Sequence, residues 1–200
     1  TGAFVPGEYV VALLAGAMLA RHPGAAVVHD SRLIWAVRDT ITRGGGRMVQ
    51  ARTGHAHLKR ALRESGAIYG GELSGHHYFR DFHACDSGMI PWLIIAGLMG
   101  ARGQPLSRLV SGLRAGFPSS DEINFRGLDP ARALARVAAA LGPEASAVDH
   151  FDGLAMDMGG WRFCLRASNT EALLRLTVEA RGDAALVAAG VARIRALLTG

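Results

Sequence analysis

The sequence of 200 residues predicts an α/β domain, an α/β/α sandwich with a mixed sheet, followed by a smaller α+β domain. Up to about residue 114, short apolar segments alternate with helical patterns, as in a parallel sheet with covering helices. Beyond residue 120, strand-like segments follow one another directly between two helices, which favours a mainly antiparallel four-stranded sheet flanked by helices. Residues 115–120 read Ala-Gly-Phe-Pro-Ser-Ser, a composition typical of a linker. We therefore expect domains at 1–114 and 121–200.

The first domain is expected to carry three strands between helices. Hydrophobic spacing and the flanking glycine and proline residues place its strands at 25–29, 48–51 and 67–69. The same signals place its helices at 8–21, about 31–43, 56–65, 87–101 and from Pro105 to about 114. Asp30 or Ser31 is expected to cap the second helix, and Asp86 or Ser87 the fourth.

The second domain is expected to place its strands next to one another in the sequence. The strand segments are 122–126, 147–151, 154–158, 161–166 and 173–179, and the helices are 130–141 and 184–198.

The charge balance is basic and comes almost wholly from arginine. The formal net charge is +5, and Lys59 is the single lysine. The arginines are spread along the chain, whereas nucleic-acid-binding proteins usually cluster their basic residues. A basic cleft for an anionic small molecule is therefore favoured, and we expect no nucleic-acid partner.

Cysteine usage and hydropathy indicate the compartment. Cys85 and Cys164 lie far apart and form no Cys-x-x-Cys pair, which suits a reducing environment. No signal peptide is recognisable, and the apolar segment 89–99 contains Pro91 and is shorter than the roughly 20 residues that span a bilayer. We expect a cytoplasmic protein without a membrane partner.

The first candidate binding loop is Gly71-Glu72-Leu73-Ser74-Gly75-His76. Its glycines permit tight turns, and Glu72 and Ser74 present a carboxylate and a hydroxyl side by side. Such a pair suits neighbouring sugar hydroxyls, which both donate and accept hydrogen bonds. The spacing differs from that of a nucleophile elbow. From these residues alone, an ordinary polar turn is an equal alternative.

The second candidate loop is Arg166-Ala167-Ser168-Asn169-Thr170-Glu171, between two predicted strands. A guanidinium, two hydroxyls, an amide and backbone N–H groups are suited to hold a phosphate. A hairpin with Ser-Asn turn chemistry is the alternative explanation.

Histidines supply the third candidate. His55 follows Arg52-Thr53-Gly54 at the expected start of a helix and is a candidate acid–base group, although a structural role is the alternative. His76, His77, His83, Cys85 and Asp86 gather polar ligands in a short segment, but their spacing fits no common zinc pattern. We expect no metal ligands in this chain.

Taken together, the motifs resemble those of the α-D-phosphohexomutase superfamily. Gly-Glu-Leu-Ser-Gly-His resembles the Gly-Glu-Met-Ser-Gly-His sugar-recognition loop of bacterial phosphomannomutase/phosphoglucomutase, and Arg-Ala-Ser-Asn-Thr-Glu resembles the phosphate-binding loop of the last domain. The order of the pieces also matches, and the resemblance covers nearly the whole chain. It implies the third and fourth domains of an enzyme that interconverts hexose 1-phosphates and 6-phosphates through a bisphosphorylated sugar.

The resemblance also implies roles for individual residues. The sugar-binding residues would be Glu72, Ser74 and His76, and the phosphate-binding residues would be Arg166, Ser168, Asn169, Thr170 and Arg175. His55 matches the Thr-Gly-His position of the family and is a catalytic candidate. Arg32 is a second candidate because it stands where a lysine is common, but an arginine does not readily release a proton.

Two family motifs are absent from these 200 residues. Nothing resembles the Ser-His-Asn-Pro phosphoserine loop or the Asp-Gly-Asp-x-Asp-Arg loop that binds Mg²⁺. We therefore expect a fragment whose partners are the missing N-terminal domains and hexose phosphates such as mannose or glucose 1- and 6-phosphate. The chain alone is expected to be inactive and to hold no Mg²⁺.

Two other functions stay open. Phosphoglucosamine mutase is the alternative enzyme, although its loop typically carries a glutamine where this chain has Leu73. A non-catalytic phosphosugar-binding module is the alternative of another class, supported by the missing phosphoserine loop.

Overall fold

The computed structural model describes residues 2–168 and 170–200 and divides the chain into two compact units, Thr1–Arg114 and Ala115–Gly200. The first unit holds a five-stranded mixed sheet in the order β2-β1-β3-β4-β5. Its strands are β1 (Ala26–His29), β2 (Arg47–Gln50), β3 (Tyr69–Gly71), β4 (His77–Phe79) and β5 (Cys85–Asp86). β1 pairs in parallel with both β2 and β3, whereas β4 and β5 are antiparallel additions.

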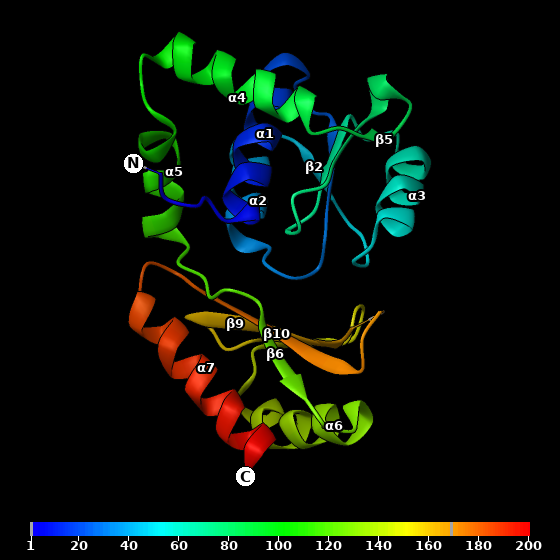
Figure 1. Cartoon of the computed structure of the whole chain (residues 1–200), viewed down its shortest axis with the longest axis vertical. Coiled ribbons are helices and arrows are strands. Elements are labelled where there is room, and N and C mark those ends of the chain that lie inside the picture. Colours follow the sequence, from blue (N-terminus) through cyan, green and yellow to red (C-terminus); the bar gives the residue numbers. More distant parts are fainter. Residues whose placement is uncertain (1, 169) are drawn as a thin grey trace. The chain divides into compact units, whose positions relative to one another are not determined.

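Helices cover both faces of this sheet. They are α1 (Gly7–Arg21), α2 (Trp35–Arg43), α3 (His55–Ser65), α4 (Met89–Arg102) and α5 (Leu106–Gly116), with a short 3₁₀ turn η1 (Arg80–Phe82) before β5. Figure 1 shows α1 and α2 on one side of the strands and α3 on the other. The side chains of β1 alternate accordingly: Val27 packs with α1 and α2, and Val28 packs with Leu58 and Leu62 of α3. The predicted sandwich with a mixed sheet is confirmed.

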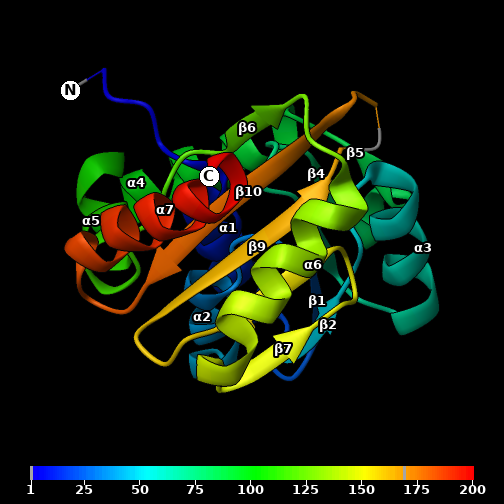
Figure 2. The same cartoon turned by 90° about the horizontal axis from the view of Figure 1, so that it is seen from below.

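The second unit is an antiparallel sheet with two helices on one face. Its sheet has five strands in the order β6-β10-β9-β8-β7, one more than predicted, because the short β7 joins the edge. The strands are β6 (Ile123–Arg126), β7 (Ala147–Asp149), β8 (Leu154–Asp157), β9 (Trp161–Ala167) and β10 (Leu173–Ala180). The helices are α6 (Pro130–Leu141) and α7 (Ala184–Thr199), with the 3₁₀ turn η2 (Gly142–Glu144) after α6. In Figure 2, α7 lies over β10 and α6 lies over β9.

The two faces of this second sheet differ in chemistry. Phe163 and Leu165 of β9 and Leu174, Leu176 and Val178 of β10 join the core beneath the helices. The alternate positions of the two strands form cross-strand pairs on the opposite face: Arg162 with Glu179, Cys164 with Thr177, and Arg166 with Arg175. The sheet therefore aligns polar and charged side chains on one face.

Several local predictions differ from the structure. The short antiparallel strands β4 and β5 are not among the three strands predicted for the first domain. α2 begins at Trp35, so neither Asp30 nor Ser31 caps it, because the polypeptide first bends at residues 31–33. The residues predicted as a linker are ordered: Ala115 and Gly116 finish α5, and Ser119 and Ser120 pair with Glu179 and Val178 at the edge of β10. Backbone pairing gives this segment a structural role that its composition does not reveal.

In the part of the chain that the structure describes, no helix combines the length and the apolar character needed to cross a membrane.

Candidate functional site

The carboxyl ends of three parallel strands meet at one edge of the first sheet. His29, Gln50 and Gly71 end β1, β2 and β3, and the strand register places them side by side. Each strand leads into one of the segments singled out in the sequence: 30–32 after β1, 52–55 after β2 and 72–76 after β3. Loops at this edge of a parallel sheet are the usual place for ligands.

A buried group of charges lies at this edge. Asp30, Arg32 and Glu72 are 3%, 4% and 3% exposed. Asp30 Oδ2 accepts hydrogen bonds from Arg32 Nε at 3.0 Å and Arg32 Nη2 at 2.6 Å. Arg32 Nη2 also lies 4.0 Å from Glu72 Oε2, so one guanidinium is placed between two carboxylates. The structure thus brings Arg32 and Glu72 together, as their assignment to one site requires.

Two hydroxyls orient the Glu72 carboxylate. Tyr78 Oη donates to Glu72 Oε1 at 2.6 Å, and Ser74 Oγ donates to Glu72 Oε2 at 3.3 Å. Burial and the bond to the charged carboxylate raise the pKa of Tyr78 well above its usual value, so it stays a donor. Tyr78 has no place in the sequence predictions. The one sequence feature that could have indicated it is a tyrosine hydroxyl two residues after the loop that ends at His76.

The second half of the loop is held by Asp86. His76 Nδ1 lies 2.6 Å from Asp86 Oδ2, and His77 N donates to Asp86 Oδ1 at 2.9 Å. These hydrogen bonds, with the charges of the two histidines, outweigh desolvation and lower the pKa of Asp86. His76 is exposed, while His77 is buried and pairs with the Tyr69 hydroxyl at 2.8 Å. Asp86 therefore anchors the loop and does not cap α4.

Burial also sets the protonation of His77. Desolvation lowers its pKa from 6.5 to about 4, with the charge of Asp86 opposing the shift and His76 adding to it. His77 is accordingly neutral near pH 7.

A close backbone approach fixes the loop from its other side. A Cβ atom at Gly7, the first residue of α1, would lie 2.0 Å from the carbonyl oxygen of Leu73. Only a glycine allows the two backbones to come this close.

His55 stands apart from this group. It is the first residue of α3, directly after Gly54, whose φ of 122° suits glycine, and its side chain is exposed. It begins a helix, as expected, at the same sheet edge, but no hydrogen bond described in the structure joins it to the group around Glu72. Its role stays a prediction.

The predicted phosphate loop joins β9 and β10 in the second unit. Arg166 and Arg175 face one another across the two strands, and Glu122, just before β6, lies between them. Glu122 Oε1 is 3.1 Å from Arg175 Nη1, and Glu122 Oε2 is 3.9 Å from Arg166 Nη2. The Nε atoms of both arginines are buried without a hydrogen-bond partner. This carboxylate offsets the repulsion between two like charges placed directly opposite each other.

The loop backbone is shaped by a serine. Ser168 Oγ accepts from Thr170 N at 3.4 Å and Glu171 N at 3.3 Å, which is the turn chemistry of a hairpin. Glu171 Oε2 in turn accepts from Arg175 Nη2 at 2.8 Å. Asn169, also predicted to bind phosphate, lies outside the described residues.

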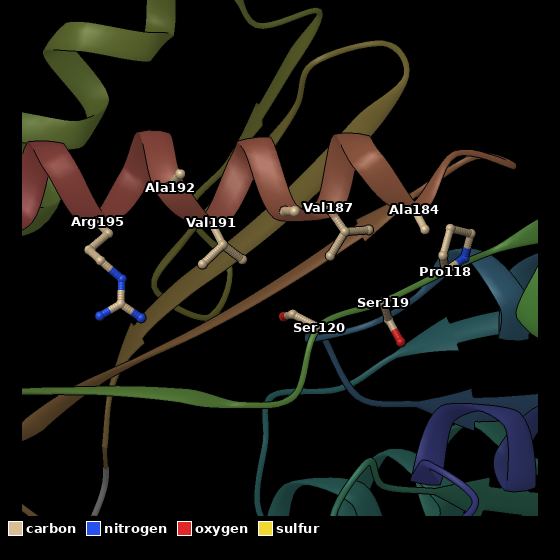
Figure 3. Close-up of a pocket in the computed structure, with 9 residues that line it drawn as sticks. Pro118, Ser119, Ser120, Ala184, Val187, Val191, Ala192 and Arg195 are labelled. Atoms are coloured by element: carbon tan, nitrogen blue, oxygen red, sulfur yellow. The ribbon is translucent and has the colours of Figure 1, made fainter.

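An apolar groove elsewhere in the second unit does not contain these residues. It has a volume of about 450 Å³ and lies between α7 and the segment at Ser119 and Ser120 (Figure 3). Its one charged side chain is Arg195, whose guanidinium stacks over Phe125 at 5.5 Å. The groove offers little to a sugar phosphate.

Among residues 2–168 and 170–200, no group of three or more His, Cys, Asp or Glu side chains is arranged to hold a metal ion.

Comparisons with known proteins match the whole fold. Residues 6–116 match the family model for phosphoglucomutase/phosphomannomutase, alpha/beta/alpha domain III, and residues 122–197 match the C-terminal domain of the same family. A phosphomannomutase from Salmonella montevideo is 53% identical over 98% of the chain, and the phosphohexose mutases of Xanthomonas campestris are 50% identical over 100%. The chain spans 43% and 45% of these relatives, less than half of their length.

Solved structures agree with this match. A phosphoglucomutase/phosphomannomutase family protein from Burkholderia thailandensis superposes with a TM-score of 0.78 at 28% identity, over 100% of this chain and 43% of that one. An N-acetylphosphoglucosamine mutase from Aspergillus fumigatus, solved with GlcNAc-6P and magnesium, has a TM-score of 0.65 at 14% identity, over 96% of this chain and 43% of that one, and shows the shared fold alone. The chain belongs to the phosphoglucomutase/phosphomannomutase family and consists of its domain III and its C-terminal domain.

Proposed function

We propose that this chain is the substrate-binding C-terminal part of a phosphomannomutase/phosphoglucomutase that interconverts hexose 1-phosphates and 6-phosphates. The observation that carries the proposal is the buried Glu72 carboxylate on its glycine-bounded loop, oriented by Tyr78 and Ser74 next to Arg32. The phosphomannomutase and phosphohexose mutase relatives, at about half identity, support the reaction class.

Glu72 is proposed to bind neighbouring sugar hydroxyls. Tyr78 occupies Oε1, so Oε2 and the Ser74 hydroxyl form the acceptor and the mixed donor–acceptor that two adjacent hydroxyls require. A carboxylate held in place by buried donors loses little conformational freedom on binding, which favours affinity. His76, held by Asp86 on the same loop, is proposed to contact the sugar from the exposed side.

The phosphate is proposed to bind to Arg166 and Arg175 with the Ser168 and Thr170 hydroxyls. Both guanidiniums already face a carboxylate, Glu122, and a phosphate would add charge-assisted hydrogen bonds to their remaining N–H groups. Asn169 is included in this proposal on the resemblance of the loop alone.

Chemistry on the phosphoryl group is proposed to need more than these 200 residues. The phosphoserine and Mg²⁺ loops of the family have no counterpart in this sequence. In phosphoryl transfer, positioning and charge neutralisation dominate catalysis, and those are the tasks that this chain would perform. His55 and Arg32 are the proposed catalytic candidates. We propose that the chain alone has no mutase activity.

Isothermal titration of the 200-residue chain with glucose 6-phosphate, mannose 1-phosphate and inorganic phosphate tests the two binding roles. Glu72→Gln is expected to weaken the binding of both hexose phosphates and to leave the binding of inorganic phosphate unchanged. Arg166→Gln is expected to weaken the binding of all three ligands. Arg43→Gln, which alters an exposed pair with Asp39, is the matched control and should change nothing. Equal affinities of wild type and Glu72→Gln for the hexose phosphates would contradict the sugar assignment. A preference for glucosamine 6-phosphate would favour the phosphoglucosamine mutase alternative.

A further inference from the structure

Asp30 connects two segments that are far apart in the sequence. Its Oδ1 accepts from the Arg32 backbone N–H at 3.1 Å, and its Oδ2 accepts from Arg32 Nε and Nη2. Oδ2 also accepts from the backbone N–H of Leu73 at 2.9 Å. One buried carboxylate therefore holds both the Arg32 guanidinium and the backbone of the sugar loop.

The charges around Arg32 make its position sensitive to Asp30. Arg32 is 4% exposed and lies 2.6 Å from one carboxylate and 4.0 Å from the other. A buried cation that loses its partner is strongly destabilised, so it moves to another anion within reach. Beside Asp30, the carboxylate that the structure describes next to Arg32 is Glu72, and a close Arg32–Glu72 pair would use the Oε2 atom.

We propose that Asp30 is a positioning residue that holds Arg32 away from a direct pair with Glu72 and so keeps Glu72 Oε2 available to the substrate. This inference rests on the proposed sugar-binding function of Glu72. Asp30 does not contact the sugar itself in this arrangement. It acts through Arg32, and its bond to Leu73 keeps the loop backbone in the orientation that presents Glu72.

The substitution Asp30→Asn separates the two tasks of Asp30. Asparagine keeps an oxygen for the Leu73 N–H but loses the negative charge that holds Arg32. We expect glucose 6-phosphate to bind the 200-residue Asp30→Asn chain at least tenfold more weakly than wild type, and inorganic phosphate to bind within twofold. Asp39→Asn makes the same chemical change in an exposed pair with Arg43 and should leave both affinities within twofold.

A second background shows whether Asp30 acts through Arg32. In an Arg32→Gln chain no guanidinium is present to capture Glu72, so adding Asp30→Asn should change glucose 6-phosphate affinity less than twofold. If Asp30 had a purely structural role, Asp30→Asn would lower the affinity for glucose 6-phosphate equally in the wild-type and the Arg32→Gln chain. That result would overturn the proposal. If Asp30→Asn does not fold, as judged from amide NMR dispersion, Asp30→Glu is compared in the same two backgrounds, with a loss of at least threefold expected only where Arg32 is present.

The outcomes distinguish the two proposals. If the wild-type chain binds glucose 6-phosphate and the Asp30→Asn chain binds it with the same affinity, the positioning role is overturned and the sugar site stands. Wild type whose glucose 6-phosphate affinity does not exceed its affinity for inorganic phosphate overturns the sugar site, and the positioning role with it.

Discussion

Replacing Tyr78 with phenylalanine removes one hydroxyl at the centre of the candidate sugar site. Tyr78 Oη donates to Glu72 Oε1 at 2.6 Å, and both side chains are buried. The substitution therefore leaves a buried carboxylate without one of its orienting donors.

The size of the effect follows from the nature of this bond. Hydrogen bonds to charged groups contribute roughly 1.5–3 kcal/mol, so we expect Tyr78→Phe to lower the free energy of unfolding of the first unit by about 2 kcal/mol. Native-state hydrogen exchange of the β1 amides measures this unit separately from the second. Glucose 6-phosphate should also bind several-fold more weakly, because Glu72 is less well oriented.

Tyr69→Phe is a matched control in the neighbouring strand. The Tyr69 hydroxyl bonds the neutral ring of His77 at 2.8 Å, so its loss should cost about 1 kcal/mol and leave sugar affinity unchanged. Equal losses of stability and of sugar affinity in the two variants would refute the argument that the Tyr78–Glu72 bond is specific to the site.

Three further predictions concern parts of the structure outside that bond. The pKa of His77 is lowered from 6.5 to about 4 in the folded protein, so between pH 6.5 and 4 the unfolded chain binds a proton that the folded chain does not. The contribution of His77 to the free energy of unfolding is therefore complete above pH 6.5 and falls by about 3 kcal/mol as the pH drops to 4. Denaturant unfolding at each pH should show this slope, and His77→Gln should flatten it. Gly7→Ala should destabilise the first unit by roughly 1–3 kcal/mol because its Cβ meets the Leu73 carbonyl oxygen, whereas Gly97→Ala in α4 meets nothing within 4 Å and should be neutral or stabilising in the same denaturation assay. Glu179→Gln breaks a buried pair with Arg162 at 3.1 Å and should cost about 3–5 kcal/mol by denaturation of the second unit; a cost no larger than that of the exposed-pair variant Asp39→Asn would contradict the importance of burial.

The sequence predicted the elements whose signals are local. Apolar periodicity and the glycine or proline residues at the element ends located the helices of both units, the strands β1 to β3 and the strands of the second sheet within a few residues. The short strands β4 and β5 of the first sheet were not predicted. The second sheet has five strands, one for each of the five predicted strand segments and one more than the predicted four-stranded sheet, because the segment that forms the short β7 also joins the sheet at its edge.

The candidate site was only partly predictable for a physical reason. Glu72 and Ser74 share one loop, so their proximity follows from spacing alone. Asp30 was interpreted as a helix cap, because a capping residue before a helical pattern is the ordinary explanation. Its partner, the Leu73 N–H, is 43 residues away, and only the parallel pairing of β1 with β3 brings the two together. Tyr78 was missed for the same reason: its role depends on the register of β4.

We propose that this chain provides the substrate-binding part of a hexose-phosphate mutase. The direct measurement is the conversion of mannose 1-phosphate to mannose 6-phosphate by a chimera that joins the N-terminal portion of the Salmonella montevideo phosphomannomutase to this chain. We expect turnover by the chimera and no turnover by the 200-residue chain alone. The Glu72→Gln variant of the chimera should turn over at least 100-fold more slowly through weaker transition-state binding, which corresponds to about 3 kcal/mol. A well-folded chimera without activity, or full activity of the Glu72→Gln variant, would contradict it.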